Sequence, residues 1–220
     1  SSKTVYDDKK QEHNHIVLVW NDGTVYQGEL KNGQFHGNGI LEHSEGFQID
    51  GNFVDGKVEG QARFSKGALS YNGKWANSCP EGQGRETLEG VYDYEGNFLQ
   101  GKKCGKGVLK IANKGEYDGN FRDNMFNGEG KFTWLDGKKY EGTWYNNRIH
   151  GKGKMVWPDG RKYIGRYSQN NKEGFGRFVW ADGREYIGNW SDGKQHGRAW
   201  YIDLQGVKTD TEWDRGIRKT

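Results

Sequence analysis

The sequence has little of what most protein cores and crosslinks are made from. Only 2 of its 220 residues are cysteine, which excludes a disulfide-stapled scaffold, and only 2 are proline, which beside 36 glycines excludes a proline-rich linker. No run of 18 apolar residues occurs, so no membrane-spanning segment is predicted. The polar residues 1–15 hold no apolar stretch of a signal peptide. We therefore expect a cytoplasmic protein in which Cys79 and Cys104 are free thiols.

Aliphatic residues are also scarce, and the mean hydropathy is −1.09. Disorder would follow from that value alone, but aromatic residues make up 14% of the chain, which is typical of a folded protein. The 33 basic and 30 acidic residues nearly cancel to a net charge of +3, which argues against nucleic acid as the main partner. The composition predicts a thin fold in which aromatic rings cover a small sheet.

What the chain does have is a repeat of about 23 residues. Its clearest marker is an aromatic or apolar residue followed two positions later by glycine and two further on by a large apolar residue. Tyrosine begins most copies, at Tyr26, Tyr71, Tyr94, Tyr117, Tyr140, Tyr163 and Tyr186, and Ile49 replaces it in the second. A second glycine series follows about seven residues after the large apolar residue. We count about eight full copies, with half copies at both ends.

The copy from Tyr140 to Gly153, YEGTWYNNRIHGKG, resembles the MORN (membrane occupation and recognition nexus) repeat. The resemblance covers roughly residues 18–216 and implies cytoskeletal, ciliary or membrane-junction settings. The second copy departs most, because Ile49 replaces tyrosine, Ala62 replaces the late glycine and one residue is missing. We expect a local irregularity there.

Alternation of apolar and polar residues predicts antiparallel strands with one apolar face. Tyr140, Gly142 and Trp144 share that face, and the segment from Trp157 to Gly160 is typical of a three-residue hairpin loop with a bulge. That loop places Gly153 opposite a glycine on the next strand and leaves a trough in which aromatic rings can lie flat.

The predicted fold is therefore all-β: an elongated, twisted single-layer antiparallel sheet of tandem hairpin repeats, solenoid-like, with about 17 strands. The array is assigned to residues 16–216, between a polar extension at 1–15 and a tail at 217–220.

Three histidines, His36, His150 and His196, occupy the same position of different repeats, and we interpret them as polar loop residues because equivalent positions lie about 9.6 Å or more apart. No nucleophile with a base and no phosphate loop is evident. We expect no enzyme activity, no catalytic residue, no metal, no cofactor and no small-molecule substrate.

The leading hypothesis is an interaction scaffold that binds an extended or helical peptide of a protein partner along a concave aromatic groove. The groove residues are predicted as Tyr94, Tyr117, Trp134, Tyr140, Trp144, Trp157, Tyr163, Trp180, Tyr186 and Trp190.

The alternative is a tether for acidic phospholipid headgroups, because the fourth and sixth repeats each carry a net charge of +3. Its residues are predicted as Lys102, Lys103, Lys106, Lys152, Lys154, Arg161 and Lys162. Further alternatives are the regulatory repeats of a larger enzyme and extracellular sugar or choline binding. Homo-oligomers fit any of these, and we expect the protein beside the cytoskeleton, a cilium or the inner membrane surface.

Overall fold

The computed structural model describes residues 4–7 and 15–219, and within these ranges the chain consists of strands, turns and short connections. It divides into two compact units, residues 1–112 (unit 1) and residues 113–220 (unit 2). No helix in the described ranges has the length and apolar character needed to cross a bilayer.

Unit 1 contains the first ten strands, β1 (Thr4–Asp7), β2 (His15–Val19), β3 (Val25–Lys31), β4 (Gln34–His43), β5 (Phe47–Val54), β6 (Lys57–Lys66), β7 (Leu69–Ala76), β8 (Cys79–Leu88), β9 (Tyr92–Leu99) and β10 (Lys102–Ile111). Unit 2 contains β11 (Gly115–Arg122), β12 (Met125–Trp134), β13 (Lys139–Tyr145), β14 (Arg148–Val156), β15 (Lys162–Ser168), β16 (Asn171–Val179), β17 (Glu185–Ser191), β18 (Lys194–Ile202), β19 (Lys208–Asp214) and β20 (Ile217–Arg218).

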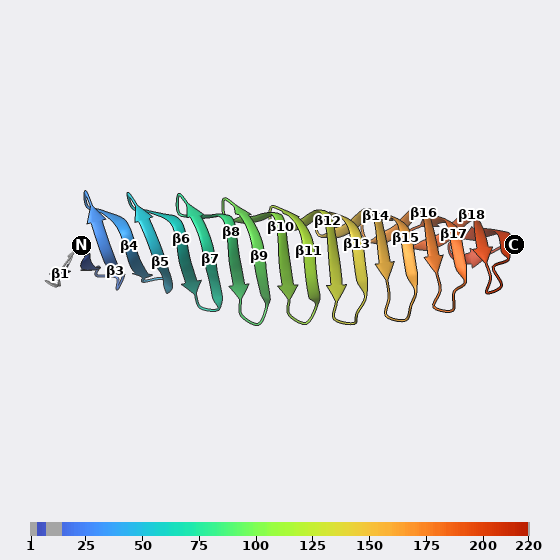
Figure 1. Cartoon of the computed structure of the whole chain (residues 1–220), viewed down its shortest axis with the longest axis horizontal. Helices are drawn as coiled ribbons and strands as arrows, with labels where there is room; N and C mark the ends of the chain where they lie inside the picture. Colours follow the sequence, from blue (N-terminus) through green and yellow to red (C-terminus); the bar gives the residue numbers. More distant parts are fainter. Residues whose placement is uncertain (1–3, 8–14, 220) are drawn as a thin grey trace. The chain divides into compact units, whose positions relative to one another are not determined.

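Within each unit every strand pairs antiparallel with the next strand in the chain, so each unit is a single layer of successive hairpins (Figure 1). The predicted all-β architecture of tandem hairpins is confirmed. The described residues form 20 strands where about 17 were expected, because short strands such as β1 and β20 extend the pairing near the two ends of the chain.

Two kinds of turn alternate along the chain. The loop after Trp157 has the predicted form: the amide of Gly160 donates to the carbonyl of Trp157 at 3.1 Å, and Gly160 has a φ of +93°. The other turn has two residues, both with positive φ, such as Asn146 (46°) and Asn147 (64°). That pair of angles defines a type I′ turn, which explains why asparagine and glycine recur there.

The predicted glycine pairing is confirmed, since Gly153 lies opposite Gly165 on one side and Gly142 on the other. The ring of Tyr140 covers this seam, and its hydroxyl donates a hydrogen bond to the carbonyl of Thr143 at 3.0 Å. Each repeat that begins with tyrosine has the same bond to the carbonyl three residues on. Because the paired glycines have no side chains, they leave the space in which the tyrosine rings lie.

The second repeat keeps this register although its sequence departs from the pattern. Ala62 pairs with Gly51 and Gly73 where most other repeats have glycine, the exception being Ala199 in the last full repeat. Ile49 stands where the other seven full repeats have tyrosine. The missing residue is absent from the loop between β6 and β7. Only two residues separate the paired Lys66 and Leu69, whereas three separate His43 and Phe47 in the preceding repeat. The expected irregularity is therefore confined to a shortened turn.

Candidate functional site

Most of the predicted groove aromatics form the core and are not on the surface. In unit 2, Tyr117, Tyr140, Tyr163 and Tyr186 have no exposed surface, and Trp144 and Trp190 are 5% and 6% exposed; Tyr94 in unit 1 is equally buried. These rings pack edge to face, as Tyr140 does on Trp144 at 5.3 Å and on Tyr167 at 5.5 Å between ring centroids. Burial to this degree leaves them no surface to offer a partner, so their role is to hold the sheet together.

Three of the predicted residues remain partly exposed, and they form a set. Trp134, Trp157 and Trp180 each begin a three-residue loop of unit 2 and follow one another at intervals of 23 residues. A cation from the far end of the same loop lies over each ring. Lys138 Nζ is 4.2 Å from the Trp134 ring, Arg161 Cζ is 5.5 Å from the Trp157 ring and Arg184 Cζ is 5.8 Å from the Trp180 ring. We call Trp134, Trp157 and Trp180 with these cations the tryptophan row.

The loops hold the row in place. In each loop the tryptophan amide donates to the carbonyl of the cationic residue, at 2.9 Å in all three. The aspartate of the loop accepts a hydrogen bond from the same residue's amide, and in two loops it also pairs with the arginine, as Asp159 does with Arg161 at 2.7 Å. Ring and cation are therefore fixed together before any partner arrives.

The residues predicted for phospholipid binding differ in their exposure and in their ion pairs. In unit 1, Lys102 and Lys106 are exposed, whereas Lys103 lies against the rings of Tyr92 and Tyr94 and forms an ion pair with Glu86. In unit 2, Lys152, Lys154 and Lys162 are exposed and have no ion pair within the described residues, while Arg161 pairs with Asp159. The ammonium group of Lys103 is thus held by contacts within the sheet and is not presented to a lipid headgroup.

Lys172 is a half-buried cation that the sequence interpretation missed. Its ammonium group lies 4.4 Å from the Trp190 ring, 4.7 Å from the Phe178 ring and 5.3 Å from the Tyr163 ring, with no carboxylate partner among the described residues. Desolvation, with a smaller contribution from Arg161, lowers the pKa of Lys172 to about 8. A period-23 comparison would have found it, because this position holds Phe126 and Ile149 in the two preceding repeats.

The three histidines stand apart from one another, as interpreted. His36 Nδ1 lies 3.6 Å from Asp55 and His196 Nδ1 lies 3.7 Å from Asp214, both near the two-residue turns. Cys79 and Cys104 are free thiols, and burial is the main factor that raises the pKa of Cys104. The described part of the chain contains no group of three His, Cys, Asp or Glu side chains that could hold a metal ion.

The profile of the MORN repeat matches six segments of the chain, residues 26–46, 94–116, 117–139, 140–160, 163–183 and 186–203. A search of curated protein sequences gave no significant match.

Among solved structures, the chain is similar to the TCP10 domain of Danio rerio CPAP in complex with a peptide of Danio rerio STIL, with 14% identity over 96% of this chain and 100% of that chain and a TM-score of 0.49. The same domain alone gives 13% identity over 96% and 95% of the two chains and a TM-score of 0.43. The SAS-4 (dCPAP) TCP domain of Drosophila melanogaster, in complex with a proline-rich motif of Ana2, gives 10% identity over 94% and 88% and a TM-score of 0.23.

Proposed function

The chain belongs to the MORN repeat family, and we propose that it is a non-catalytic scaffold that binds a protein partner through the tryptophan row of unit 2. The observation that carries this proposal is the threefold recurrence of a partly exposed tryptophan under a cation, at Trp134, Trp157 and Trp180. Tryptophan and arginine are the residues that most often dominate the binding energy of protein interfaces.

The geometry supports recognition of an extended segment. Equivalent points of successive hairpins lie two strands apart, about 9.6 Å, so the three rings span about 19 Å. An extended peptide of about six residues covers that distance. The rings are held by their loops and cations before binding, so little side-chain entropy is lost on contact. A partner would gain most from apolar side chains spaced to meet successive rings.

The test uses the purified full chain as bait in a pull-down with quantitative mass spectrometry. Wild type is compared with the triple variant Trp134→Ala, Trp157→Ala, Trp180→Ala, and with Leu99→Ala, which removes a 56% exposed side chain of unit 1 as a control. We expect at least one protein to be captured by wild type and Leu99→Ala and lost with the triple variant. If every captured protein is retained by the triple variant, the row is not the binding surface.

Phospholipid binding is the second candidate, favoured by Lys152 and Lys154, which are exposed and have no ion pair among the residues that the structure describes. Co-sedimentation with vesicles containing phosphatidylserine separates the two functions. A lipid tether predicts co-sedimentation that is lost with Lys152→Glu and Lys154→Glu and kept in the triple tryptophan variant. A protein scaffold predicts no co-sedimentation of wild type, and capture of the partner in the pull-down by both lysine variants. The regulatory role in a larger enzyme, self-association, and a cytoplasmic location beside the cytoskeleton, a cilium or the inner membrane surface stay predictions.

A further inference from the structure

The face of unit 2 opposite the buried tyrosines carries an apolar band. Ile164 is 48% exposed, Phe175 58% and Trp200 41%, and Ile187 lies half-buried between them. They come from neighbouring strands: Ile164 is opposite Arg177, Arg177 is opposite Ile187, and Ile187 is opposite Trp200. Alternation places all of them on the face that in other repeats is mostly polar, with Ile40 and Val108 as the apolar equivalents of Trp200.

The repeats themselves show that this band is not required by the fold. The position of Ile164 and Ile187 holds a polar residue in every other copy, namely Gln27, Asp50, Asn72, Glu95, Asp118, Glu141 and Asp210. The position of Phe175 holds Asn38, Gln61, Gln83, Lys106, Glu129, Lys152 and Arg198. Since seven hairpins form with polar residues at the Phe175 position, a large exposed ring there adds nothing that the hairpin needs.

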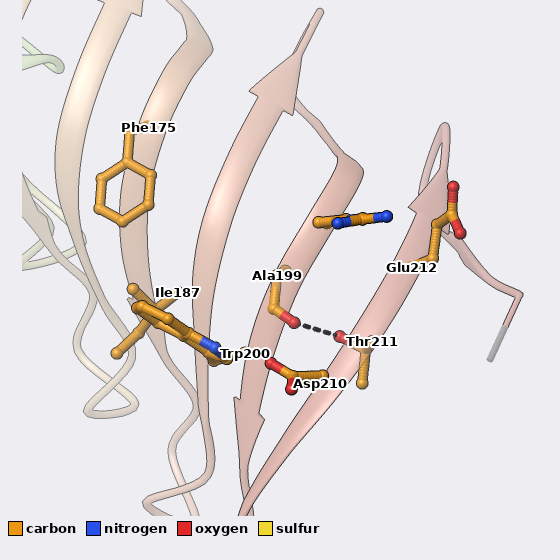
Figure 2. Close-up of a pocket in the computed structure, with 8 residues that line it drawn as sticks. Phe175, Ile187, Ala199, Trp200, Asp210, Thr211 and Glu212 are labelled. Carbon is orange, nitrogen blue, oxygen red and sulfur yellow. Dashed lines mark hydrogen bonds between the residues drawn. The ribbon is translucent and has the colours of Figure 1, made fainter.

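Two hollows on this face meet at Phe175. One, of about 450 Å³, is lined by Phe175, Ile187 and Trp200 and also by Thr211, whose hydroxyl donates a hydrogen bond to the carbonyl of Ala199 at 3.0 Å (Figure 2). The other, of about 860 Å³, is lined by Ile164 and Phe175 and by the glycine seam. Phe175 is the residue that lines both hollows, and we call the surface that they form across β14 to β19 the channel; the larger hollow also reaches Glu129 of β12 and Glu141 of β13.

Charge differs along this channel. At the β14–β16 end its walls carry Lys152, Lys154, Arg166 and Arg177. The first three have no ion pair within the described residues, and only Arg177 is bound, bidentately, to Glu185. Glu129 and Glu141 also line this end, which leaves an excess of positive charge. At the β19 end the charges balance, because Asp210 and Glu212 are matched by Arg198 and by Lys208, whose Nζ lies 3.4 Å from the centre of the Trp200 ring.

We propose that this channel is a second docking surface, and that its occupant is an extended segment of a partner protein with apolar side chains flanked on one side by Asp or Glu residues. The apolar side chains would lie on Phe175, Ile187 and Trp200, and the acidic ones would meet Lys154 and Arg166. Six strands span about 24 Å, which an extended segment of about seven residues covers. Only one end of the channel carries an excess of positive charge, which fits a segment with acidic residues on one side better than a uniformly anionic membrane. This surface lies on the other face from the buried tyrosines and does not depend on the tryptophan row.

The test pans a phage-displayed library of random 12-residue peptides against the full chain and measures the affinity of synthetic, fluorescently labelled versions of the enriched peptides. The variants carry residues that other repeats have at the same positions: Phe175→Gln, as in Gln61, and Ile164→Asn, as in Asn72. Arg166→Glu tests the charge. Tyr145→Gln is the matched control, because Tyr145 is 53% exposed in the same unit and lines neither hollow. Thermal unfolding followed by circular dichroism confirms that each variant is folded.

We expect peptides that combine apolar residues with Asp or Glu, an affinity about tenfold weaker for each of the three variants, and no change for Tyr145→Gln. The proposal is overturned if no such peptide is enriched, or if the peptides bind Phe175→Gln as tightly as wild type. If light scattering shows a dimer of wild type that dissociates with Phe175→Gln, the occupant is a second copy of the chain. If the chain binds phosphatidylserine vesicles and this binding requires Phe175, the occupant is a membrane. Either result would refute the proposal that the channel binds an extended segment of a partner protein.

Discussion

The phenol ring of Tyr140 occupies the space that a side chain at Gly153, on the next strand, would need. A Cβ atom on Gly153 would lie 2.3 Å from the Tyr140 hydroxyl oxygen and 2.5 Å from its ring carbons, far inside contact distance. We therefore expect Gly153→Ala to lower the free energy of unfolding by about 1–3 kcal/mol, as overpacking does. Urea denaturation followed by fluorescence measures this.

The second repeat indicates how the loss can be recovered, since Ile49 and Ala62 coexist there. Tyr140→Ile removes the ring that the new methyl group would strike. The double variant should be more stable than the sum of the single effects predicts, by about 0.5–3 kcal/mol. Strictly additive effects would mean that ring and glycine do not interact.

Trp144 and Trp157 are expected to respond in opposite ways to truncation. Trp144 is 5% exposed, its indole N–H donates to the Gly130 carbonyl at 3.2 Å, and it packs on Tyr117 and Tyr140. Trp144→Ala should therefore cost about 3–5 kcal/mol of unfolding free energy. Trp157→Ala, at a partly exposed loop position, should cost less than half of that. Equal losses would show that Trp157 belongs to the core and is not available for binding.

Lys172 should make stability depend on pH. Its folded pKa of about 8 lies below the ordinary value of 10.5, so between these values the unfolded chain binds more protons than the folded one. Stability from this group therefore rises as the pH increases from about 8 towards 10.5, and the penalty is fully present below pH 8. Tyrosines act in the opposite direction above pH 10, because burial raises the pKa of Tyr186 to about 12.

The matched change is Lys172→Ile, since Ile149 fills this position one repeat earlier. We expect the variant to be more stable at pH 7, by about 1–3 kcal/mol, and to lack the gain in stability that Lys172 gives wild type between pH 8 and 10. Denaturation at several pH values measures both effects. A variant that is less stable than wild type at pH 7 would show that the contacts of the ammonium with the surrounding rings outweigh its desolvation.

Asn170 joins neighbouring hairpins through one side chain. Its Oδ1 accepts a hydrogen bond from the Ile149 amide at 2.9 Å, while its own amide donates to the Ile149 carbonyl at 2.9 Å. Asn170→Gly keeps the positive φ of 74° without strain, as Gly193 does in the next repeat, but removes the acceptor. Amide hydrogen exchange at Ile149 should become faster, with a stability loss of about 0.5–1.5 kcal/mol. Unchanged exchange would mean that water replaces the asparagine.

The sequence predicted the fold because its repeat fixes local chemistry at every turn and strand. The spacing of Tyr140, Gly142 and Gly153, and the loop ending at Gly160, were enough for the register and the aromatic face. What the sequence could not show is how completely a single layer covers its own rings. Each tyrosine lies in a glycine trough with its hydroxyl bound to the backbone, which removes it from the surface that was predicted to bind.

The exposed features were harder to predict because they depart from the repeat. Phe175 differs from its equivalents in all other copies and Lys172 from all except Lys103, so a search for what the copies share passes over both residues. Comparison of equivalent positions marks both residues as exceptions. Their surroundings, a set of aromatic rings for Lys172 and a channel for Phe175, required the register shifts within each hairpin, which the repeat spacing does not specify.

Site-specific photo-crosslinking tests the central claim most directly, because it reports contact in the folded protein. Benzoylphenylalanine is placed at Trp157 in the tryptophan row or, as the control, at Leu99, an exposed position in unit 1. Both proteins are exposed to cell extract, irradiated, and the crosslinked products identified by mass spectrometry. The account predicts a protein that crosslinks from position 157, is competed by unlabelled wild type and not by the triple tryptophan variant, and is absent from position 99. The same products from both positions, or competition by the triple variant, would contradict it.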